Sequence, residues 1–267
     1  MKQEWHTVRA NALVWDHRPV AAPGKQPKLA DSVSALTSCC RGQMIYHEGA
    51  PVECWYRVVS GTARRFIVRT DGRRQIIDLL LAGDVFGFGA RGNHSFTAEA
   101  IRDGTVVARY PRSRLEGLIR SDAKIAQEVQ EMALEETRRL QELILILGRT
   151  TAQEKVGAFL VHLAERLAGG PANHVILPIS RYDIADYLAL SVETVSRALT
   201  SLKRSGLIKF AGTRQIAIID RDAIETSGGF GQIGAGPRVK PGRMPGSDTR
   251  IFASVSFSAR AGRNGSQ

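Results

Sequence analysis

The sequence predicts an α+β protein, in which strands fill the N-terminal part and helices dominate the C-terminal part. Glycines recur at intervals of 11 or 12 residues from Gly49 to Gly83 with short apolar runs between them, which is typical of a β sandwich or barrel. From Asp122 onward, apolar residues recur every three or four positions, which is the period of an α-helix. The length of 267 residues and an ordinary globular composition, 43% hydrophobic and 24% charged, favour two domains with a sizeable core.

The β unit is expected over residues 36–121. Within it, Asp71-Gly72 lies between two apolar runs, and this pair predicts a hairpin because glycine tolerates the positive φ that a tight turn demands. Residues 1–35 mix basic residues with prolines and show little periodicity, so we expect an irregular leader before the β unit.

The segment 122–148 predicts one long amphipathic helix. Its apolar residues recur at helical spacing from Ile125 to Leu147, with Glu136 as an interruption, and Gly148 ends it. The apolar stripe has to be covered by its own domain, by a second copy of the chain, or by both. We therefore expect a homodimer that forms along this helix.

A second domain is expected over residues 149–226. Thr151 and Glu154 have the spacing of a capping box and predict the start of a further helix. Residues 227–267 are rich in glycine and proline and carry six basic residues against one acidic residue. Such a composition cannot bury enough apolar area to offset its ordering entropy, so we expect a disordered basic tail.

Residues 180–203 predict two short helices joined by a tight turn. Ser180 and Asp183 form a second capping box, and Ser191 is a good N-cap for the helix that follows. This arrangement is a helix-turn-helix, whose second helix enters the major groove of DNA. Two short apolar strands after Gly206 predict a β-hairpin, so the domain is interpreted as a winged helix.

Glu193, Ser196 and Arg197 lie on one exposed face of the predicted second helix, at positions i, i+3 and i+4. Arginine can bond both acceptors of a guanine, glutamate accepts from a cytosine amino group, and serine can do either, so we assign base contacts to these three residues. The net charge of +11 favours an anionic partner, here double-stranded DNA. Contacts to DNA phosphates, which position a protein without reading sequence, are assigned to Ser180, Arg181, Ser191, Thr194 and Lys203.

At this point the sequence resembles a known family, the Crp/Fnr transcription regulators. Gly83–Gly87 is similar to the β-roll motif of that family, and Glu193–Arg197 is similar to its DNA-reading motif, in the form of the Fnr branch. Three further segments resemble FixK-type regulators within that branch: Asp71–Ile76, Leu147–Thr150 and Ile184–Leu188.

The resemblance implies a β-roll of the cyclic-nucleotide-binding, jelly-roll type, a dimerisation helix and a C-terminal winged helix-turn-helix. It implies a homodimeric regulator, an activator, that works with RNA polymerase and binds the palindrome TTGAT, four unread base pairs, ATCAA. Arg197 would take the guanine, Glu193 the opposing cytosine and Ser196 the adjacent thymine. For FixK-type proteins, the resemblance further implies control of microaerobic respiration or nitrogen-fixation genes.

The residues needed for the family's usual effectors are largely missing. Members that bind cyclic nucleotides use a Gly-Glu pair for the ribose, whereas here Gly87 is followed by Phe88. An iron–sulfur cluster needs four cysteine thiolates, and the chain has Cys39, Cys40 and Cys54 only. We therefore expect no cofactor, no metal and activity without an effector. A regulator that senses a small ligand in the β-roll, or a redox signal at Cys39 and Cys40, stays open as the alternative.

The sequence contains no motif that indicates an enzyme or a membrane protein. The signatures of P-loop proteins, α/β-hydrolases, zinc proteases and C-x-x-C redox proteins do not occur, so we expect no enzyme and no catalytic residues. Helix capping and solvation explain Asp183 and Asp186. No apolar run approaches the roughly 20 residues that span a membrane. The N-terminus lacks an apolar signal stretch and cysteines are sparse, so we expect a cytoplasmic protein without a membrane partner.

Overall fold

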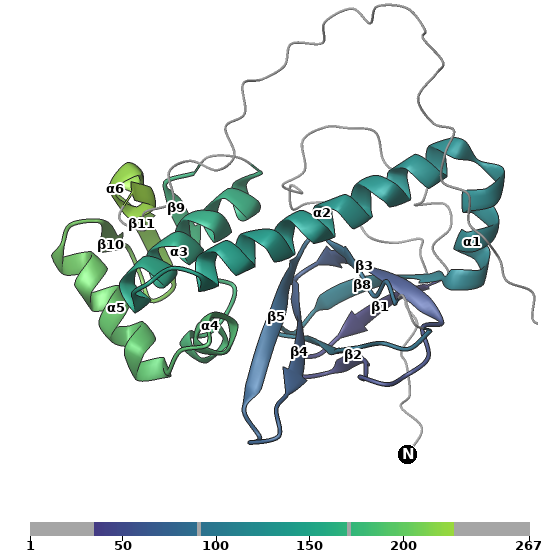
Figure 1. Ribbon diagram of the computed structural model, residues 1–267, viewed down its shortest axis with the longest axis horizontal. Helices are drawn as coiled ribbons and strands as arrows, with labels where there is room; N and C mark the ends of the chain where they lie inside the picture. The colour runs from purple at the N-terminus through teal and green to yellow at the C-terminus, as the bar shows by residue number, and fades with distance from the viewer. Residues whose placement is uncertain (1–34, 90–91, 170–171, 227–267) are drawn as a thin grey trace, which may run out of the picture. The chain divides into compact units, whose positions relative to one another are not determined.

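The computed structural model describes residues 35–89, 92–169 and 172–226, and these residues fall within one compact unit. The predicted leader, apart from Ala35, and the predicted tail at 227–267 lie outside the described residues. Figure 1 shows an N-terminal group of strands, the long helix α2 (Ala123–Leu147) and a C-terminal group of helices with short strands. The architecture is therefore the α+β arrangement that the sequence predicts.

Two antiparallel four-stranded sheets form the N-terminal β-roll, in the strand orders β1-β8-β3-β6 and β2-β7-β4-β5. Buried side chains from both sheets meet between them, including Val58, Leu80 and Phe86, none of which is measurably exposed. The strands are β1 (Ala35–Cys39), β2 (Met44–Tyr46), β3 (Cys54–Ser60), β4 (Thr62–Val68), β5 (Arg74–Leu81), β6 (Val85–Phe86), β7 (Thr97–Ala100) and β8 (Thr105–Pro111).

The hairpin predicted at Asp71-Gly72 is confirmed. Strands β4 and β5 pair antiparallel from Thr62 opposite Leu81 to Val68 opposite Arg74. Gly72 has a φ of 78°, which a side chain at this position would disfavour. The turn therefore joins two strands of one sheet, and the beginning of β5 lies next to it.

Two helices follow the β-roll. The long helix α2 begins after Asp122, whose carboxylate accepts the backbone N–H of Lys124, and ends at Gly148, as the sequence predicts. The preceding helix α1 (Arg112–Ser121) was not predicted, although Leu115, Leu118 and Ile119 have helical spacing, because it lies within the range assigned to the β unit.

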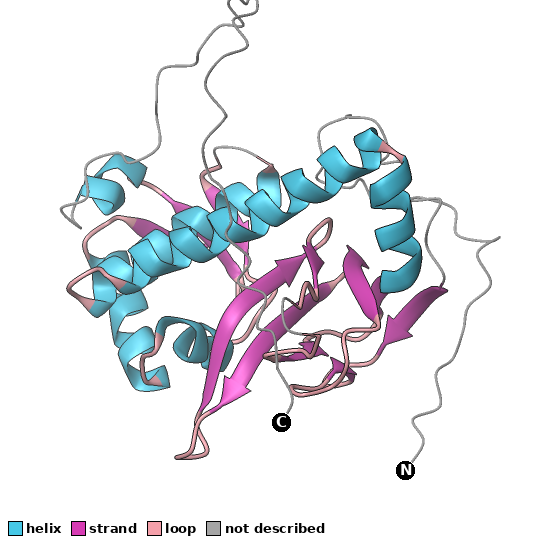
Figure 2. Cartoon of the chain, turned by 45° about the vertical axis from the view of Figure 1, so that its right-hand side comes forward, coloured by secondary structure: helices cyan, strands magenta, loops and turns pink. Residues whose placement is uncertain are grey.

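The C-terminal part combines four helices with a three-stranded sheet in the order β10-β11-β9. Figure 2 shows helices and short strands together in this part of the molecule. The hairpin of β10 (Ile208–Phe210) and β11 (Gln215–Ile218) is the predicted wing. Strand β9 (His174–Ile176), which completes the sheet, was not predicted. The helices are α3 (Ala152–Ala168), α4 (Arg181–Leu188), α5 (Val192–Arg204) and α6 (Arg221–Thr226).

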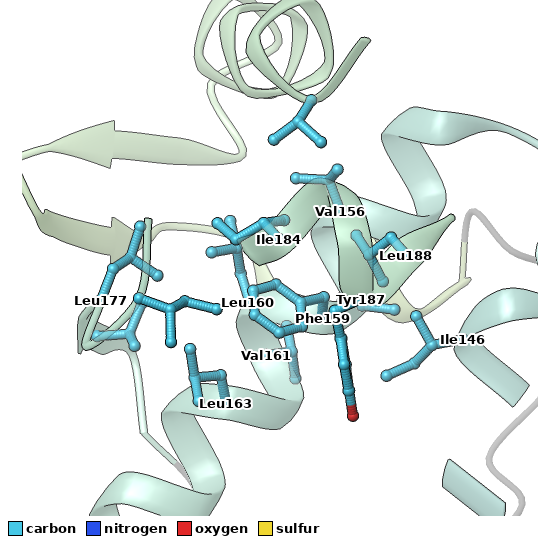
Figure 3. Close-up of a cluster of buried hydrophobic side chains, with 14 of the residues drawn as sticks. Ile146, Val156, Phe159, Leu160, Val161, Leu163, Leu177, Ile184, Tyr187 and Leu188 are labelled. Atoms are coloured by element: carbon cyan, nitrogen blue, oxygen red, sulfur yellow. The ribbon is translucent and has the colours of Figure 1, made fainter. Parts of the chain in front are cut away.

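One apolar core supports these helices. Phe159 and Leu160 of α3 pack with Ile184 and Leu188 of α4, and all four side chains are almost fully buried (Figure 3). The same cluster includes Ile76 of β5, so the core continues from the β-roll into the C-terminal helices. The elements that carry the predicted DNA contacts are thus held on a packed base rather than on loops.

Candidate nucleic-acid interface

Local capping interactions define the two helices of the helix-turn-helix. The Ser180 hydroxyl accepts the backbone N–H of Asp183, and the Asp183 carboxylate accepts the backbone N–H of Ser180, so the predicted capping box is present at α4. Ala189 ends α4 in the left-handed conformation with a φ of 53°. The Leu190 backbone N–H then donates to the carbonyl of Ala185 at 3.0 Å, which closes the turn before α5.

Helix α5 presents a polar face above a buried apolar face. Glu193 and Arg197 are exposed and Ser196 is half-buried, whereas Val195, Ala198, Leu199 and Leu202 are buried. A hydrogen bond to its own backbone N–H, followed by one with the Ser191 hydroxyl, lowers the pKa of Glu193, so this side chain is an ionised acceptor at neutral pH. The face therefore combines a hydrogen-bond acceptor, a hydroxyl and a guanidinium.

The predicted phosphate contacts are distributed unevenly around this face. A guanidinium nitrogen of Arg181 lies 3.4 Å from the Ser196 hydroxyl, so Arg181 lies beside this polar face of α5. The hydroxyls of Ser191 and Thr194 lie 3.0 Å apart at the N-terminus of α5. Lys203 lies at the other end of α5, about 15 Å along the helix axis from Glu193, with its ammonium 5.8 Å from the ring centre of Phe210.

The hydroxyl of Ser180 is already engaged within the protein. It donates to the Asp183 carboxylate at 2.6 Å and accepts the Asp183 backbone N–H. Ser180 is therefore engaged in the capping of α4, much as the Ser191 hydroxyl is engaged at the start of α5, where it accepts the backbone N–H of Thr194.

A hollow of about 240 Å³ adjoins α5, and the sequence did not predict it. Arg197 and Thr194 line one side, and Gln153 from the first turn of α3 lines the other. The Ser201 hydroxyl on α5 donates to the Gln153 side-chain carbonyl at 2.6 Å, which fixes the two helices against each other. Gln153 lies 41 residues before Thr194, so only the packing of α3 on α5 brings it to this surface.

The β-roll holds a larger cavity of about 500 Å³, lined mainly by apolar side chains, with Leu140 and Ile144 contributed by α2. Arg65 is the one guanidinium among the described lining residues, and it is paired with Asp78 at 2.8 Å and Glu136 at 2.5 Å. This pairing explains why a glutamate interrupts the apolar stripe of α2. The described lining therefore offers a cyclic phosphate no unpaired guanidinium.

Two aromatic contacts complete the cavity wall. Phe88, at the position where the family places its ribose-binding glutamate, packs edge-on against Trp55 with ring centres 4.7 Å apart. His94 stacks on Tyr46 at 3.7 Å. Burial, with a smaller effect of Arg65, lowers the pKa of His94, so its ring is neutral at physiological pH.

The cysteines differ in exposure. Cys40 is exposed, while Cys39 and Cys54 are buried, and all three are free thiols. Burial, together with the neighbouring Cys40, raises the pKa of the Cys39 thiol, which disfavours the reactive thiolate. Within the described ranges, no group of three or more His, Cys, Asp or Glu side chains is arranged to hold a metal ion. None of the helices in the described part of the chain combines the length and apolar character needed to cross a bilayer.

Two domain families match the sequence. Residues 36–122 match the cyclic nucleotide-binding domain, and residues 154–226 match the Crp-like helix-turn-helix domain. These two ranges include the β-roll with α1 and the helix-turn-helix with its wing.

Relatives of known name share most of the chain. The nitrogen fixation regulation protein FixK of Azorhizobium caulinodans is 41% identical over 225 residues, which are 82% of this chain and 90% of that protein. FixK of Rhizobium meliloti is 40% identical over 185 residues, 69% of this chain and 83% of that protein. The transcriptional activator protein FnrL of Cereibacter sphaeroides is 33% identical over 213 residues, 76% and 85% of the two chains.

Solved structures match the fold over a similar range. FixK2 from Bradyrhizobium japonicum superposes with a TM-score of 0.65 at 41% identity, covering 71% of this chain and 94% of its own. TTHB099, a transcriptional regulator of the CRP family from Thermus thermophilus, superposes with a TM-score of 0.57 at 28% identity, covering 72% and 95%.

Proposed function

Since this chain belongs to the Crp/Fnr family of DNA-binding transcription regulators, we propose that it binds the palindrome TTGAT, four base pairs, ATCAA, as a homodimer and without an effector. The observation that supports this most is the exposed face of α5, where Glu193, Ser196 and Arg197 lie together above a buried apolar face. Arg197 takes the guanine, Glu193 the opposing cytosine and Ser196 the adjacent thymine.

The DNA backbone is held on both sides of this face. Arg181, Ser191 and Thr194 border it on α4 and α5, and Lys203 extends the contact toward the wing. The hollow between Gln153 and Arg197 is a further place for a phosphate oxygen, because amide and hydroxyl groups are common phosphate partners. These contacts fix the register, and the base contacts supply the specificity.

Replacing Arg181 tests the backbone contacts. In Arg181→Ala, affinity for cognate and scrambled duplexes is expected to fall by similar factors, because a phosphate contact carries no sequence information. The plot of log K against log salt should become shallower by about 1 for each protomer. Titrations at several salt concentrations measure this slope. An unchanged slope, or a loss confined to the cognate duplex, would remove Arg181 from the phosphate contacts and place it among the base-reading residues.

The dimer is proposed to form along α2. This helix exposes large apolar side chains: Leu134 is 61% exposed, Ile144 67% and Leu145 38%. A two-fold axis beside α2 would cover each of them against the same surface of a second copy. The two recognition helices can then address the two arms of a palindrome.

Ile144→Glu is expected to convert the dimer to a monomer at concentrations where the wild type is dimeric. Each interface uses Ile144 twice, and burying an isoleucine contributes about 1.5–3 kcal/mol, so the dimer loses roughly 3–6 kcal/mol. Sedimentation velocity measures the state, with Ile144→Leu as the control that keeps the apolar area. A glutamate variant that sediments as the wild type does would rule out an interface at this position.

The proposal of effector independence rests on the cavity in the β-roll. Arg65, the guanidinium among its described lining residues, is neutralised by two carboxylates, and an aromatic ring replaces the ribose-binding glutamate. The cavity of about 500 Å³ and its apolar lining favour one alternative, a small apolar ligand that acts on the same DNA-binding form. A shift in melting temperature of the pure protein with such a ligand would support that alternative.

The regulated process is inferred from the named relatives. Two proteins with about 40% identity are called nitrogen fixation regulation proteins, and another relative is called a transcriptional activator. We extend this role to the present chain as an activator of nitrogen-fixation or microaerobic genes that acts with RNA polymerase in the cytoplasm.

A binding titration tests the proposed function. Purified full-length protein is titrated into labelled duplex carrying the TTGAT and ATCAA arms, with no ligand present and at fixed salt, and fluorescence anisotropy is recorded. We expect tight binding to this duplex and binding at least 10³-fold weaker to a scrambled one. Equal affinity for the two duplexes would contradict both the half-site and the effector-independent state.

A further inference from the structure

Two acidic residues of α4 are paired with basic residues of the β-roll. Arg74, at the start of β5, donates through its guanidinium to the Asp186 carboxylate at 2.9 and 2.8 Å. The neighbouring Gln75 donates its side-chain N–H to the backbone carbonyl of Asp186 at 2.7 Å. The two FixK-like segments noted in the sequence, Asp71–Ile76 and Ile184–Leu188, are therefore in direct contact.

A second, buried ion pair lies beside the first. Arg64 of β4 bonds both Asp183 of α4 and Glu99 of β7, and all three side chains are at most 11% exposed. Arg64 and Arg74 both lie over the ring of Phe66, at 5.8 and 5.5 Å from its centre. Asp183 thus has two roles, since it caps α4 and also receives a β-roll arginine.

These ion pairs fix the orientation of α4 on the β-roll more than they stabilise the folded protein. Buried ion pairs repay the cost of desolvation only with good geometry, so their net contribution to folding is small while their orientation is strict. Here the bonds reach both the side chains and a backbone carbonyl of one short helix, which limits its rotation as well as its displacement. Helix α5 packs on α4 across the three-residue turn, so it takes the orientation that α4 is given.

We propose that Arg74 and Gln75, with Arg64 behind them, are positioning residues for DNA recognition, which hold the helix-turn-helix in one orientation on the β-roll without a ligand. This inference rests on the proposed function, because the orientation of the helix-turn-helix matters only if the two helix-turn-helix units of a dimer read the two arms of one DNA site. Arg74 touches no DNA and acts through α4, where it bonds Asp186 and lies 3.6 Å from the Asp183 carboxylate. The set of bonds between Arg64, Arg74 and Gln75 on one side and Asp183 and Asp186 on the other is called the α4 clamp below.

The clamp predicts selectivity for the distance between the arms. Duplexes with the same arms separated by three, four, five or six base pairs are titrated with wild type, Arg74→Ala, Asp186→Ala and the double variant. The control is Arg73→Ala, because Arg73 is one residue away and, within the described part of the chain, its exposed side chain is ion-paired with Asp71 of the same turn. Wild type and control should strongly prefer four base pairs.

In the clamp variants, affinity for the four-base-pair site is expected to fall on the order of ten-fold, within the usual range of coupling between sites. The preference over the other spacers should flatten, and scrambled DNA should bind as before. The double variant should lose no more than Arg74→Ala alone, because that substitution already removes the bond to Asp186, together with the longer contacts of Arg74 to Asp183 and Glu99 at 3.6 Å. Retained spacer preference in both single variants, or losses that add in the double variant, would overturn the clamp. A general loss of folding would lower affinity for every duplex alike and would count against it too.

A measurement without DNA separates the clamp from the proposed function. If wild type itself fails to distinguish the palindrome from scrambled DNA, the proposed function fails and the spacer assay says nothing about α4. Amide hydrogen exchange of the free protein then decides: Arg74→Ala should speed exchange in α4 relative to wild type and Arg73→Ala. Equal exchange in all three proteins would overturn the clamp on its own.

Discussion

Asp183→Ala is expected to lower the free energy of unfolding by about 3–5 kcal/mol, the usual effect of removing one partner from a buried ion pair. The substitution leaves the guanidinium of Arg64 buried, with Glu99 as its remaining carboxylate partner within the described residues. It also removes the carboxylate that accepts the backbone N–H and the hydroxyl of Ser180 at the start of α4. A loss of this size is a third or more of the stability of many domains.

Urea denaturation followed by circular dichroism measures this change, with Asp186→Ala as the matched control. The Asp186 side chain is 29% exposed and its ion pair with Arg74 is partly solvated, so its removal should cost about 1 kcal/mol or less. The two aspartates lie one turn apart on the same helix and bond arginines of the same sheet. Equal, small losses for both variants would show that burial of the Arg64 pair has no energetic consequence.

Arg197→Ala is expected to lose roughly 1–3 kcal/mol of binding free energy at the cognate half-site, which is about 5- to 150-fold in affinity. The exposed guanidinium of Arg197 can bond two acceptors of one guanine, and alanine can bond neither. Preference at that single base pair should relax, while binding to scrambled DNA should change little. Titrations against duplexes with each base at that position measure both effects.

The control for this variant is Arg204→Ala, which removes the same charge from the exposed C-terminal end of α5. Its effect should be modest, similar on every duplex and dependent on salt. If Arg197→Ala also weakened all duplexes alike, its role would be that of a phosphate contact and the assignment of the guanine would be wrong.

Elements with local signals could be predicted from the sequence. The capping boxes at Thr151 and Ser180 mark two helix starts, and both are present. The boundaries of α2 follow from Asp122, the apolar period and Gly148. In each case the residues that determine the structure lie within one or two helical turns of each other, so a sequence window contains the whole signal.

The elements that escaped prediction depend on distant partners. Strand β9 has three residues, and it exists as a strand because β11 pairs with it. Helix α6 is short, and it packs closely on α3, where Gly157 leaves room for Ile224. Neither segment has a period of its own that is long enough to predict a structure.

The residues of the candidate nucleic-acid interface also differ in how far they could be predicted from the sequence. The face of Glu193, Ser196 and Arg197 follows from helical spacing alone, and the structure places these residues on one side of α5 as expected. The ion pairs of Asp183 and Asp186 cannot be predicted from helical spacing, because Arg64 lies 119 residues from Asp183 in the chain. Capping and solvation were therefore an incomplete explanation of this pair, and Asp186 is corrected from a solvated residue to the partner of Arg74.

Selection from random DNA tests whether α5 of this regulator reads a palindromic sequence without an effector. Full-length protein, purified without added ligand, is incubated with duplexes that carry a randomised stretch, and the bound molecules are recovered and sequenced. We predict enrichment of a two-fold symmetric site with TTGAT arms separated by four base pairs. Bound DNA with no enriched sequence, or with an enriched site that lacks the guanine in its arms, would contradict it.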